Sequence, residues 1–331
     1  MELSTGMIVP DLTRWQTAFL AAVQDRDCSH HTLTLYRRVT TEIIVFAAQV
    51  QTEISMRDLN TYFFGRLLAA KADKVATDSN QAKTFSTSSK QTYITVIKCF
   101  LRFIEEQNDE CVAMLKNVTN LTVQAEHKVK PAYNPQQEDR ILVALEKLKD
   151  TGRTTSLRNF TTLRNILMTK LLLNTGIRAG ELALLHYEEL EPFAGPGGLA
   201  MYQFIVTGKG KRQRQVFIEC AEIDEELALL KSRFKVSGLI AVSSKGLPLG
   251  GVQINHNVSR ITDRLGIPNG CHIFRHTFAR RLISHGVDPK SVQELLGHSK
   301  LQTTLDFYYD ANEHIKAAAV VKGKPGTGVK G

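Results

Sequence analysis

The sequence contains little cysteine, and none of it is arranged to bind a metal or to form a disulfide framework. Its five cysteines are odd in number, scattered along the chain and without any Cys-x-x-Cys pair (Cys28, Cys99, Cys111, Cys220 and Cys271). This pattern argues against a cysteine-rich zinc site and against a small secreted domain held by disulfides. It is typical of a protein that works in a reducing compartment.

Long apolar runs and targeting signals are missing as well. No run in the sequence approaches the roughly 20 apolar residues that a membrane-spanning helix needs. The N-terminal stretch MELSTGMIVPDLTRW has no basic start followed by an apolar core, so no signal peptide is predicted. We therefore expect a cytoplasmic, nucleoid-associated protein without a membrane partner.

The chain does have length and positive charge. Its 331 residues are enough for two domains, each with its own core. Its 43% apolar and 23% charged residues are ordinary for a globular protein. The formal charge of +9 and the sequence pI of about 9.3 favour a polyanionic partner, and nucleic acid is expected ahead of a membrane surface.

The N-terminal third reads as an all-helical unit. Apolar residues recur at helical spacing in four stretches between residues 12 and 106. Residues 73–89 are polar and predict an exposed loop. Residues 125–135 lose the periodicity and contain two prolines, which predicts a linker after a helical domain over residues 1–124. The unit carries candidate DNA contacts, each of which taken singly is better explained as part of a solvated helix face: Arg37, Arg38, Lys83, Lys90 and Lys98.

A second domain is expected over residues 136–318, and its first notable motif is TGIRAGEL. Gly176 interrupts a helical pattern that then resumes, which holds Arg178 near a helix N-terminus, where anions are favoured. Glu181 follows one turn later, placed to orient that guanidinium. The alternative is a helix-start arginine paired with a surface glutamate.

Two alternating runs, Met201–Val206 and Gln215–Ile218, flank a glycine-rich basic turn. This pattern predicts a β-hairpin with Lys209 exposed at its tip. Further candidate DNA contacts follow in the same turn, although a solvated charged hairpin is the plainer interpretation: Lys211, Arg212 and Arg214. Together these patterns predict a mainly α fold with a small β-sheet, in two domains.

The residues most suggestive of chemistry lie between Cys271 and Asp310. His272 and Arg275 are three apart and share a helix face, so both can reach one anionic group. His298 follows a second helical pattern, and Tyr308 and Tyr309 come soon after it. Each of these residues alone is more often a packing residue. In this order they suggest covalent phosphoryl chemistry, because they bind or protonate phosphate oxygens and end in an aromatic hydroxyl.

These motifs resemble the tyrosine recombinases. TGIRAGEL, VTGKGKRQRQVFI, HIFRHTFA, LLGHSKLQTT and the tyrosine after them occur in the order and spacing of Xer-type recombinases and phage integrases. The resemblance implies an N-terminal helical core-binding domain and an α+β catalytic domain that close around double-stranded DNA. It also implies a homo-tetramer on two recombination sites, assembled from monomers or dimers.

The resemblance further implies a role for each matching residue. Arg178 and Arg275 resemble the pair that clamps the scissile phosphate, with His272 and His298 beside them. Lys209 resembles the lysine that protonates the leaving 5′ oxygen, and the tyrosine forms a 3′-phosphotyrosyl link. Positioning and electrostatics can carry such a reaction, so we expect neither a metal nor a cofactor.

Two positions depart from the family pattern. The family's tyrosine falls nine or ten residues after the histidine that matches His298. Position nine is Phe307 and position ten is Tyr308, so Tyr308 is the expected nucleophile and Tyr309 the second choice. A replaced tyrosine at Phe307 stays open as a third interpretation. The usual proline before the first histidine is Cys271, which removes no catalytic group.

The last residues of the chain predict a helix and a tail, and three other functions compete with recombination. Residues 311–321 predict a small apolar helix, which in the family docks on a neighbouring protomer, and residues 319–331 predict a flexible tail. Type IB topoisomerase activity and an idle DNA-binding regulator of the same fold remain alternatives. A zinc hydrolase built on His272 and His276 is disfavoured, because no glutamate follows His272 as HExxH requires.

Overall fold

The structure is a computed structural model that describes residues 8–26, 28–50, 54–77, 85–108, 113–124, 130–149, 156–208, 210, 212–298, 300–302 and 304–305. It divides into two compact units, Met1–Lys128 and Val129–Gly331. The boundary falls inside the expected linker of residues 125–135. Within the described part of the chain, no helix combines the length and the apolar character that crossing a membrane requires.

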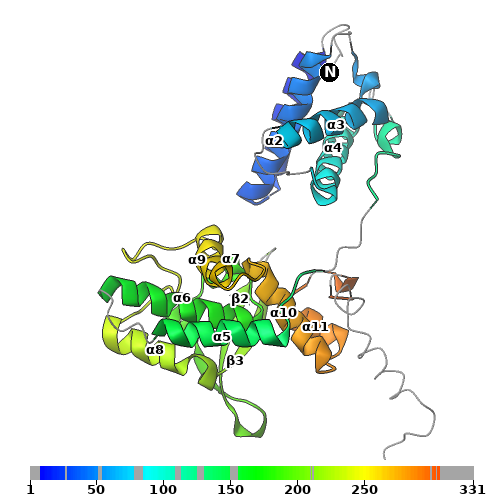
Figure 1. The fold of residues 1–331 in the computed structure, drawn as a ribbon. Helices are drawn as coiled ribbons and strands as arrows, with labels where there is room; N and C mark the ends of the chain where they lie inside the picture. Colours follow the sequence, from blue (N-terminus) through cyan, green and yellow to red (C-terminus); the bar gives the residue numbers. More distant parts are fainter. Residues whose placement is uncertain are drawn as a thin grey trace, which may run out of the picture. The chain divides into compact units, whose positions relative to one another are not determined.

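The first unit packs four long helices around an apolar core (Figure 1): α1 (Ile8–Asp25), α2 (His30–Gln49), α3 (Thr61–Thr77) and α4 (Thr87–Gln107). Serine caps begin two of them, because the Ser29 and Ser86 hydroxyls accept from backbone N–H groups of the first turn. The expected loop over residues 73–89 was therefore too long: α3 continues to Thr77, and the cap at Ser86 starts α4. The core between the helices is rich in aromatic rings, including Trp15, Phe64 and Phe100.

The second unit combines a three-stranded antiparallel sheet with helices (Figure 1). The strands lie in the order β1 (Glu191–Ala194), β2 (Ala200–Thr207) and β3 (Gln213–Glu219). The helices are α5 (Pro135–Lys149), α6 (Ser156–Thr175), α7 (Ala179–Leu182), α8 (Cys220–Phe234), α9 (Gly251–Arg264), α10 (Cys271–Ser284) and α11 (Pro289–Leu296). The predicted fold class, mainly α with a small sheet in an α+β second domain, is confirmed.

The sheet of the second unit has one buried and one open face. Phe204 and Val206 on β2 and Val216 and Ile218 on β3 are buried in the same core as α6. Because side chains alternate along a strand, the residues between them point outward, and Ile205 is exposed. The β2–β3 turn therefore extends from two strands whose inner face is packed into the core.

Residues 130–133 pack as part of the second unit. The Tyr133 ring is buried against Phe274, its backbone N–H donates to Thr277 Oγ1 at 2.8 Å, and its hydroxyl donates to the Pro268 carbonyl at 2.8 Å. The Pro131 carbonyl lies 3.1 Å from His276 Nδ1. The segment that enters this unit is thus fastened along α10.

Candidate active site

A sharp turn after α6 places Arg178 at the start of α7. Gly176 adopts a left-handed conformation with φ of 63°, and a Cβ there would lie 2.6 Å from the Phe278 ring, so only glycine fits. Arg178 is the N-cap of α7, and its backbone N–H donates to Glu181 Oε2 at 2.8 Å. Its Nη1 donates to Glu181 Oε1 at 2.7 Å, while 40% of the side chain stays exposed. Its Nη2 donates to the Gly297 carbonyl at 3.3 Å, so the guanidinium is held at both Nη atoms while its side chain stays partly exposed.

Arg275 lies on α10 and is only 7% exposed. Its Nη1 donates to the Gly176 carbonyl at 2.7 Å, and its Nη2 donates to the Leu296 carbonyl. Burial, followed by the neighbouring charges of Arg178 and Arg214, lowers the pKa of Arg275 to about 9, which still leaves it protonated at neutral pH. Arg275 therefore ties the turn before α7 to the end of α11.

His298 follows directly after the C-terminus of α11. The helix ends in Gly297, which is left-handed with φ of 65°, and the His298 backbone N–H then donates to the Gln293 carbonyl at 3.0 Å. Its Nδ1 lies 2.8 Å from Thr304 Oγ1. Burial, together with Arg275 and Arg178, lowers the pKa of His298 to about 3, so the ring is neutral near pH 7.

His272 occupies the exposed first turn of α10. Its ring meets the His276 ring edge to face, with 5.6 Å between centroids. A Cβ at Gly270, which has φ of 119°, would lie 2.6 Å from the His272 ring. Burial lowers the pKa of His276 to about 4, against the raising effect of its contact with the Pro131 carbonyl. In the described ranges, no three His, Cys, Asp or Glu side chains gather so that they could hold a metal ion.

Cys271 makes a bond that proline cannot make. Its backbone N–H donates to Asn255 Oδ1 at 2.7 Å, which ties the start of α10 to α9. The thiol is buried, and burial raises its pKa to about 12, so it is not a reactive thiolate. The departure from the family pattern is therefore matched by a local hydrogen bond.

Arg214 lies in a different environment from the one that a DNA-contact role assumes. Its Nη1 and Nη2 donate to the two carboxylate oxygens of Glu181 at 2.9 and 2.8 Å, and its Nε donates to the Leu295 carbonyl at 2.8 Å. Its side chain is 10% exposed. Burial raises the pKa of Glu181, but the hydrogen bonds from Arg214 and from the Arg178 backbone outweigh it and lower that pKa to about 2.

An open groove of about 710 Å³ lies beside Arg178, Arg214 and His298, and neither Arg275 nor His272 is among its lining residues. Gly208 and Gly210 of the β2–β3 turn form one part of its lining, and Gly297 and His298 form another. The remaining lining residues include five charged side chains, four of them positive: Arg178, Arg212, Arg214, Lys290 and Glu294. The excess of positive charge beside a neutral imidazole suits an anion such as a phosphodiester.

Five predicted residues of this region lie outside the described residues. They are Lys209 and Lys211 in the turn, and Phe307, Tyr308 and Tyr309 after α11. The described neighbours of the turn are close to the arginines, because a Cβ added to Gly208 would lie 3.3 Å from Glu181 Oε1 and 3.7 Å from Arg178 Nη1. The predicted helix at 311–321 and the tail at 319–331 also lie outside the described residues.

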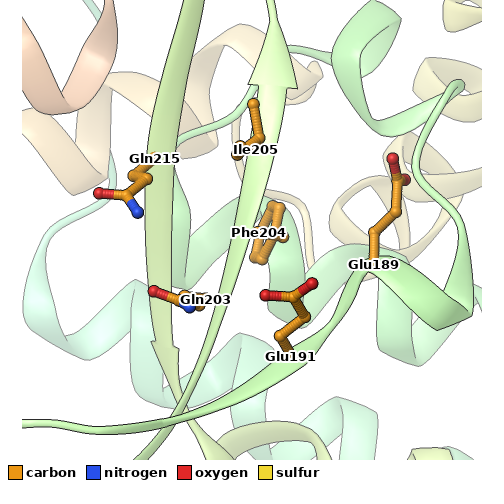
Figure 2. Close-up of a pocket in the computed structure, with 6 residues that line it drawn as sticks. All are labelled: Glu189, Glu191, Gln203, Phe204, Ile205 and Gln215. Atoms are coloured by element: carbon orange, nitrogen blue, oxygen red, sulfur yellow. The ribbon is translucent and has the colours of Figure 1, made fainter.

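A second hollow, of about 210 Å³, lies on the open face of the sheet. Figure 2 shows its six lining residues, with Gln203, Ile205 and Gln215 along the strands and the carboxylates of Glu189 and Glu191 nearby. The described residues that line it offer two carboxylates and no basic group. It is unsuited to a phosphate, and the predicted site residues are elsewhere.

The predicted DNA contacts of the first unit lie on α2 and α4. Arg37 and Arg38 are exposed on α2, and the Arg38 guanidinium stands 5.9 Å from the centre of the Tyr93 ring on α4. Lys90 and Lys98 are half-buried on α4, and Lys83 lies outside the described residues. The described members thus belong to a pair of adjacent helices.

Comparison with known proteins finds relatives over most of the chain. The protein named tyrosine recombinase XerC from Rickettsia massiliae is 26% identical over 316 residues, covering 92% of this chain and 94% of its own length. Its namesake from Rickettsia felis is 26% identical over 302 residues, covering 88% and 90%. Both alignments extend across both units.

Solved structures resemble the fold over most of the chain. A XerH site-specific recombinase bound to a palindromic difH substrate, in a post-cleavage complex, superposes with a TM-score of 0.70 at 20% identity, covering 90% of this chain and 82% of that one. The Tn1549 transposon integrase with transposon right end DNA gives a TM-score of 0.63 at 14% identity, covering 93% and 98%. The sequence model of the phage integrase family matches residues 134–314. The chain therefore belongs to the phage integrase family, the tyrosine recombinases.

Proposed function

We propose that this protein is a site-specific DNA recombinase that cuts and rejoins DNA through a covalent phosphotyrosyl intermediate. The observation that carries the proposal is the approach of Arg178 and Arg275 to the Leu296–His298 segment, beside a neutral histidine. Membership of the tyrosine recombinase family supports it. The two guanidiniums are the clamp that a phosphodiester in transfer requires.

The proposed reaction uses each group for one task. The Tyr308 hydroxyl loses its proton to water as its oxygen attacks phosphorus, which forms the 3′-phosphotyrosyl bond and breaks the bond to the 5′ oxygen. Lys209 protonates that leaving oxygen. Negative charge gathers on the non-bridging oxygens, where donors fixed in advance by Glu181 and by main-chain carbonyls stabilise it. A neutral His298 donates a hydrogen bond to these oxygens without adding charge. His272, which is exposed in the first turn of α10, is proposed to contact the same phosphate. In rejoining, the 5′ hydroxyl of another strand attacks the phosphotyrosyl phosphorus. This attack forms a new phosphodiester bond and releases the tyrosine.

The DNA partner and the assembly follow from the same proposal. The N-terminal unit binds the core of the site with Arg37, Arg38, Lys83, Lys90 and Lys98, and the hairpin residues Lys211 and Arg212 add contacts to the backbone. One solved structure of similar fold is a lambda integrase dimer bound to a COC' core site, with a TM-score of 0.58 at 17% identity. We extend this to a tetramer on two sites, which the mass of the two-site complex in native electrophoresis tests.

The experiment for the nucleophile uses a nicked suicide substrate that carries the protein's own site, identified by sequencing the DNA bound in its host. Wild type and Tyr309→Phe are expected to form a denaturation-resistant adduct, and Tyr308→Phe is expected to bind DNA without forming one. A dead Tyr309→Phe would shift the register by one residue. An adduct gained only by Phe307→Tyr would identify position 307 as that of the nucleophile.

Two outcomes would replace the proposal with a rival. Relaxation of supercoiled DNA without exchange between two marked sites would favour topoisomerase-like activity. Stable site binding without any adduct, from the wild type as well, would favour an idle DNA-binding regulator.

A further inference from the structure

We propose that Arg214 is a positioning residue of this active site, which holds Glu181, and through it Arg178, in register with the C-terminus of α11. The inference rests on the proposed function and deepens it. It assigns to Arg214 a task that requires no contact with DNA. The sequence predicted Arg214 as a DNA contact. We assign it instead to holding the side chains that contact the DNA.

The Arg214 guanidinium is engaged through all three of its nitrogens. Its two Nη atoms match the two oxygens of Glu181 in the paired geometry that arginine and carboxylate favour. Its Nε donates to the Leu295 carbonyl. Arg214 pairs with Val206 in the sheet register and precedes buried Val216 by two residues, so strand alternation points it inward.

Glu181 uses both oxygens to join the two arginines. Oε1 accepts from Nη1 of Arg178 and from Nη1 of Arg214, at 2.7 and 2.9 Å. Oε2 accepts from the Arg178 backbone N–H and from Nη2 of Arg214, both at 2.8 Å. Without Arg214, the buried carboxylate would lose half of these donors and the rotational restraint that they impose. Arg178 would then be held by a carboxylate that can itself turn.

The end of α11 gathers the arginines. Three consecutive carbonyls accept from three different guanidiniums: Leu295 from Arg214, Leu296 from Arg275 and Gly297 from Arg178. The last carbonyls of a helix have no partner within it and carry partial negative charge, so they attract cations. Gly297 also gives Arg214 room, because a Cβ there would lie 3.1 Å from Arg214 Cδ. His298 follows at once, so one short segment contacts Arg178, Arg275 and Arg214 and also carries the histidine.

The alternative is an ion pair that only stabilises the fold, and the second unit contains a matched example. Glu226 is buried between Lys149 and Lys170, on helices that carry none of the proposed reacting residues. Each buried carboxylate has two cationic neighbours, and in each case one of them can be replaced by glutamine. Lys170→Gln is therefore the control for Arg214→Gln.

The experiment measures adduct formation in single turnover, site binding and melting temperature for both variants in the full chain. Arg214→Gln is expected to bind the site within a few-fold of wild type and to form the adduct on the order of 100-fold more slowly. Lys170→Gln is expected to lower the melting temperature and keep the rate. Arg214→Lys, which keeps the charge but not the fork, should fall between wild type and Arg214→Gln and stands in if the glutamine variant does not fold.

A pH profile separates positioning from general weakening. Glu181 faces Arg178 and Arg214 directly, with Arg275 nearby. Loss of Arg214 removes a cause of its lowered pKa and leaves burial, so the rate of Arg214→Gln should decline as pH falls through the acidic range. Glu181→Gln in the same background should abolish that decline. A rate and a profile like those of wild type in folded Arg214→Gln would overturn the inference.

A second readout does not depend on activity. The Arg178 side-chain signal in spectra of ¹⁵N-arginine-labelled protein should show restricted guanidinium rotation in wild type and faster rotation in Arg214→Gln. Unchanged rotation would also overturn the inference. By contrast, a wild type that forms no adduct yet shows the change in rotation would contradict the proposed function and leave the positioning role supported.

Discussion

The second unit buries two carboxylates between pairs of cations, and the two clusters differ in what their cations leave open. Glu226 on α8 accepts from Lys170 at 2.9 and 3.1 Å and lies 2.6 Å from Lys149. Glu181 is held by Arg178 and Arg214. Both carboxylates are almost fully buried, at 0% and 4% side-chain exposure.

The lysine cluster is closed. Lys149 also contacts Glu146 and Glu225, at 3.0 and 2.7 Å, and its side chain is 8% exposed. Lys170 is 10% exposed. Their charges are directed to carboxylates on α5 and α8, and the cluster joins α5, α6 and α8, which lie side by side (Figure 1). Such an arrangement stabilises packing and offers little to a ligand.

The arginine cluster has an open edge. Arg178 keeps 40% of its side chain exposed beside the groove, although Glu181 holds its other edge. The two clusters therefore differ in whether a cation beside the buried carboxylate stays accessible to a ligand. Burial of the carboxylate by itself does not distinguish the two clusters.

The largest expected effect comes from the open cation. Arg178→Lys keeps the charge but loses the forked donor geometry, so adduct formation should slow on the order of 100-fold or more while site binding is largely kept. Lys149→Gln, in the closed cluster, should leave the rate unchanged. Single-turnover cleavage of both variants measures the difference. A near wild-type rate for Arg178→Lys would reduce Arg178 to a helix-start residue.

The next effect concerns stability and comes from the closed cluster. Glu226→Gln removes the buried carboxylate that Lys149 and Lys170 share and leaves them the more exposed Glu146 and Glu225. Removal of one partner from a buried pair costs about 3 kcal/mol. We expect a fall of roughly 10 °C in melting temperature with an unchanged rate of adduct formation below the transition. A slowed reaction in folded Glu226→Gln would show that the two clusters are coupled.

Much of the fold could be predicted from periodicity and caps, whereas the arginine network could not. The helix beginning after Ser29, the β2–β3 hairpin and the start of a helix at Arg178 all have local patterns. Strand β1 was missed because its four residues include a proline and alternate too briefly to be recognised. It exists because it pairs with β2 through Glu191 and Gln203.

Arg214 shows how a local signal can be present and still be misread. The run KRQRQ looks like a solvated charged turn, and only its alternation with Val216 and Ile218 reveals which arginine points inward. The meeting of Arg178, Arg214 and Arg275 at three successive carbonyls has no local signal at all. These residues are far apart in sequence, and tertiary packing alone brings them together. The bond between His298 and Thr304 was also missed, because serine and threonine partners of a histidine follow no fixed spacing.

The third effect is a loss of unfolding free energy at acidic pH, caused by protonation of Glu181 in the arginine cluster. The pKa of Glu181 is about 2 in the folded protein and ordinarily 4.5. A lowered pKa contributes stability that is present above the ordinary value and lost as pH falls toward the folded one. Between about pH 5 and pH 3, the advantage of wild type over Glu181→Gln in unfolding free energy should shrink by about 2 kcal/mol. Urea titrations at a series of pH values measure it, and a constant difference would contradict the lowered pKa.

The smallest effect lies on the alkaline side and belongs to the lysine cluster. Burial lowers the pKa of Lys149, but the hydrogen bonds that its ammonium donates to Glu225, Glu226 and Glu146 outweigh it and raise that pKa above its ordinary 10.5. A raised pKa contributes stability that is complete below the ordinary value and lost as pH rises through the folded one.

Lys149→Met keeps an unbranched side chain that is one atom shorter and removes its charge. Between about pH 9 and pH 11, the advantage of wild type over this variant should shrink by about 1 kcal/mol, because the unfolded lysine loses its proton while the folded one keeps it. Tyrosines titrate in the same range, but they do so in both proteins, and the difference cancels them. The same pH change should leave the gap between wild type and Glu181→Gln unaltered, since that carboxylate is already ionised. A difference that shrinks for Glu181→Gln would mean that the two clusters do not titrate independently. A difference that stays constant for Lys149→Met would contradict the raised pKa of Lys149.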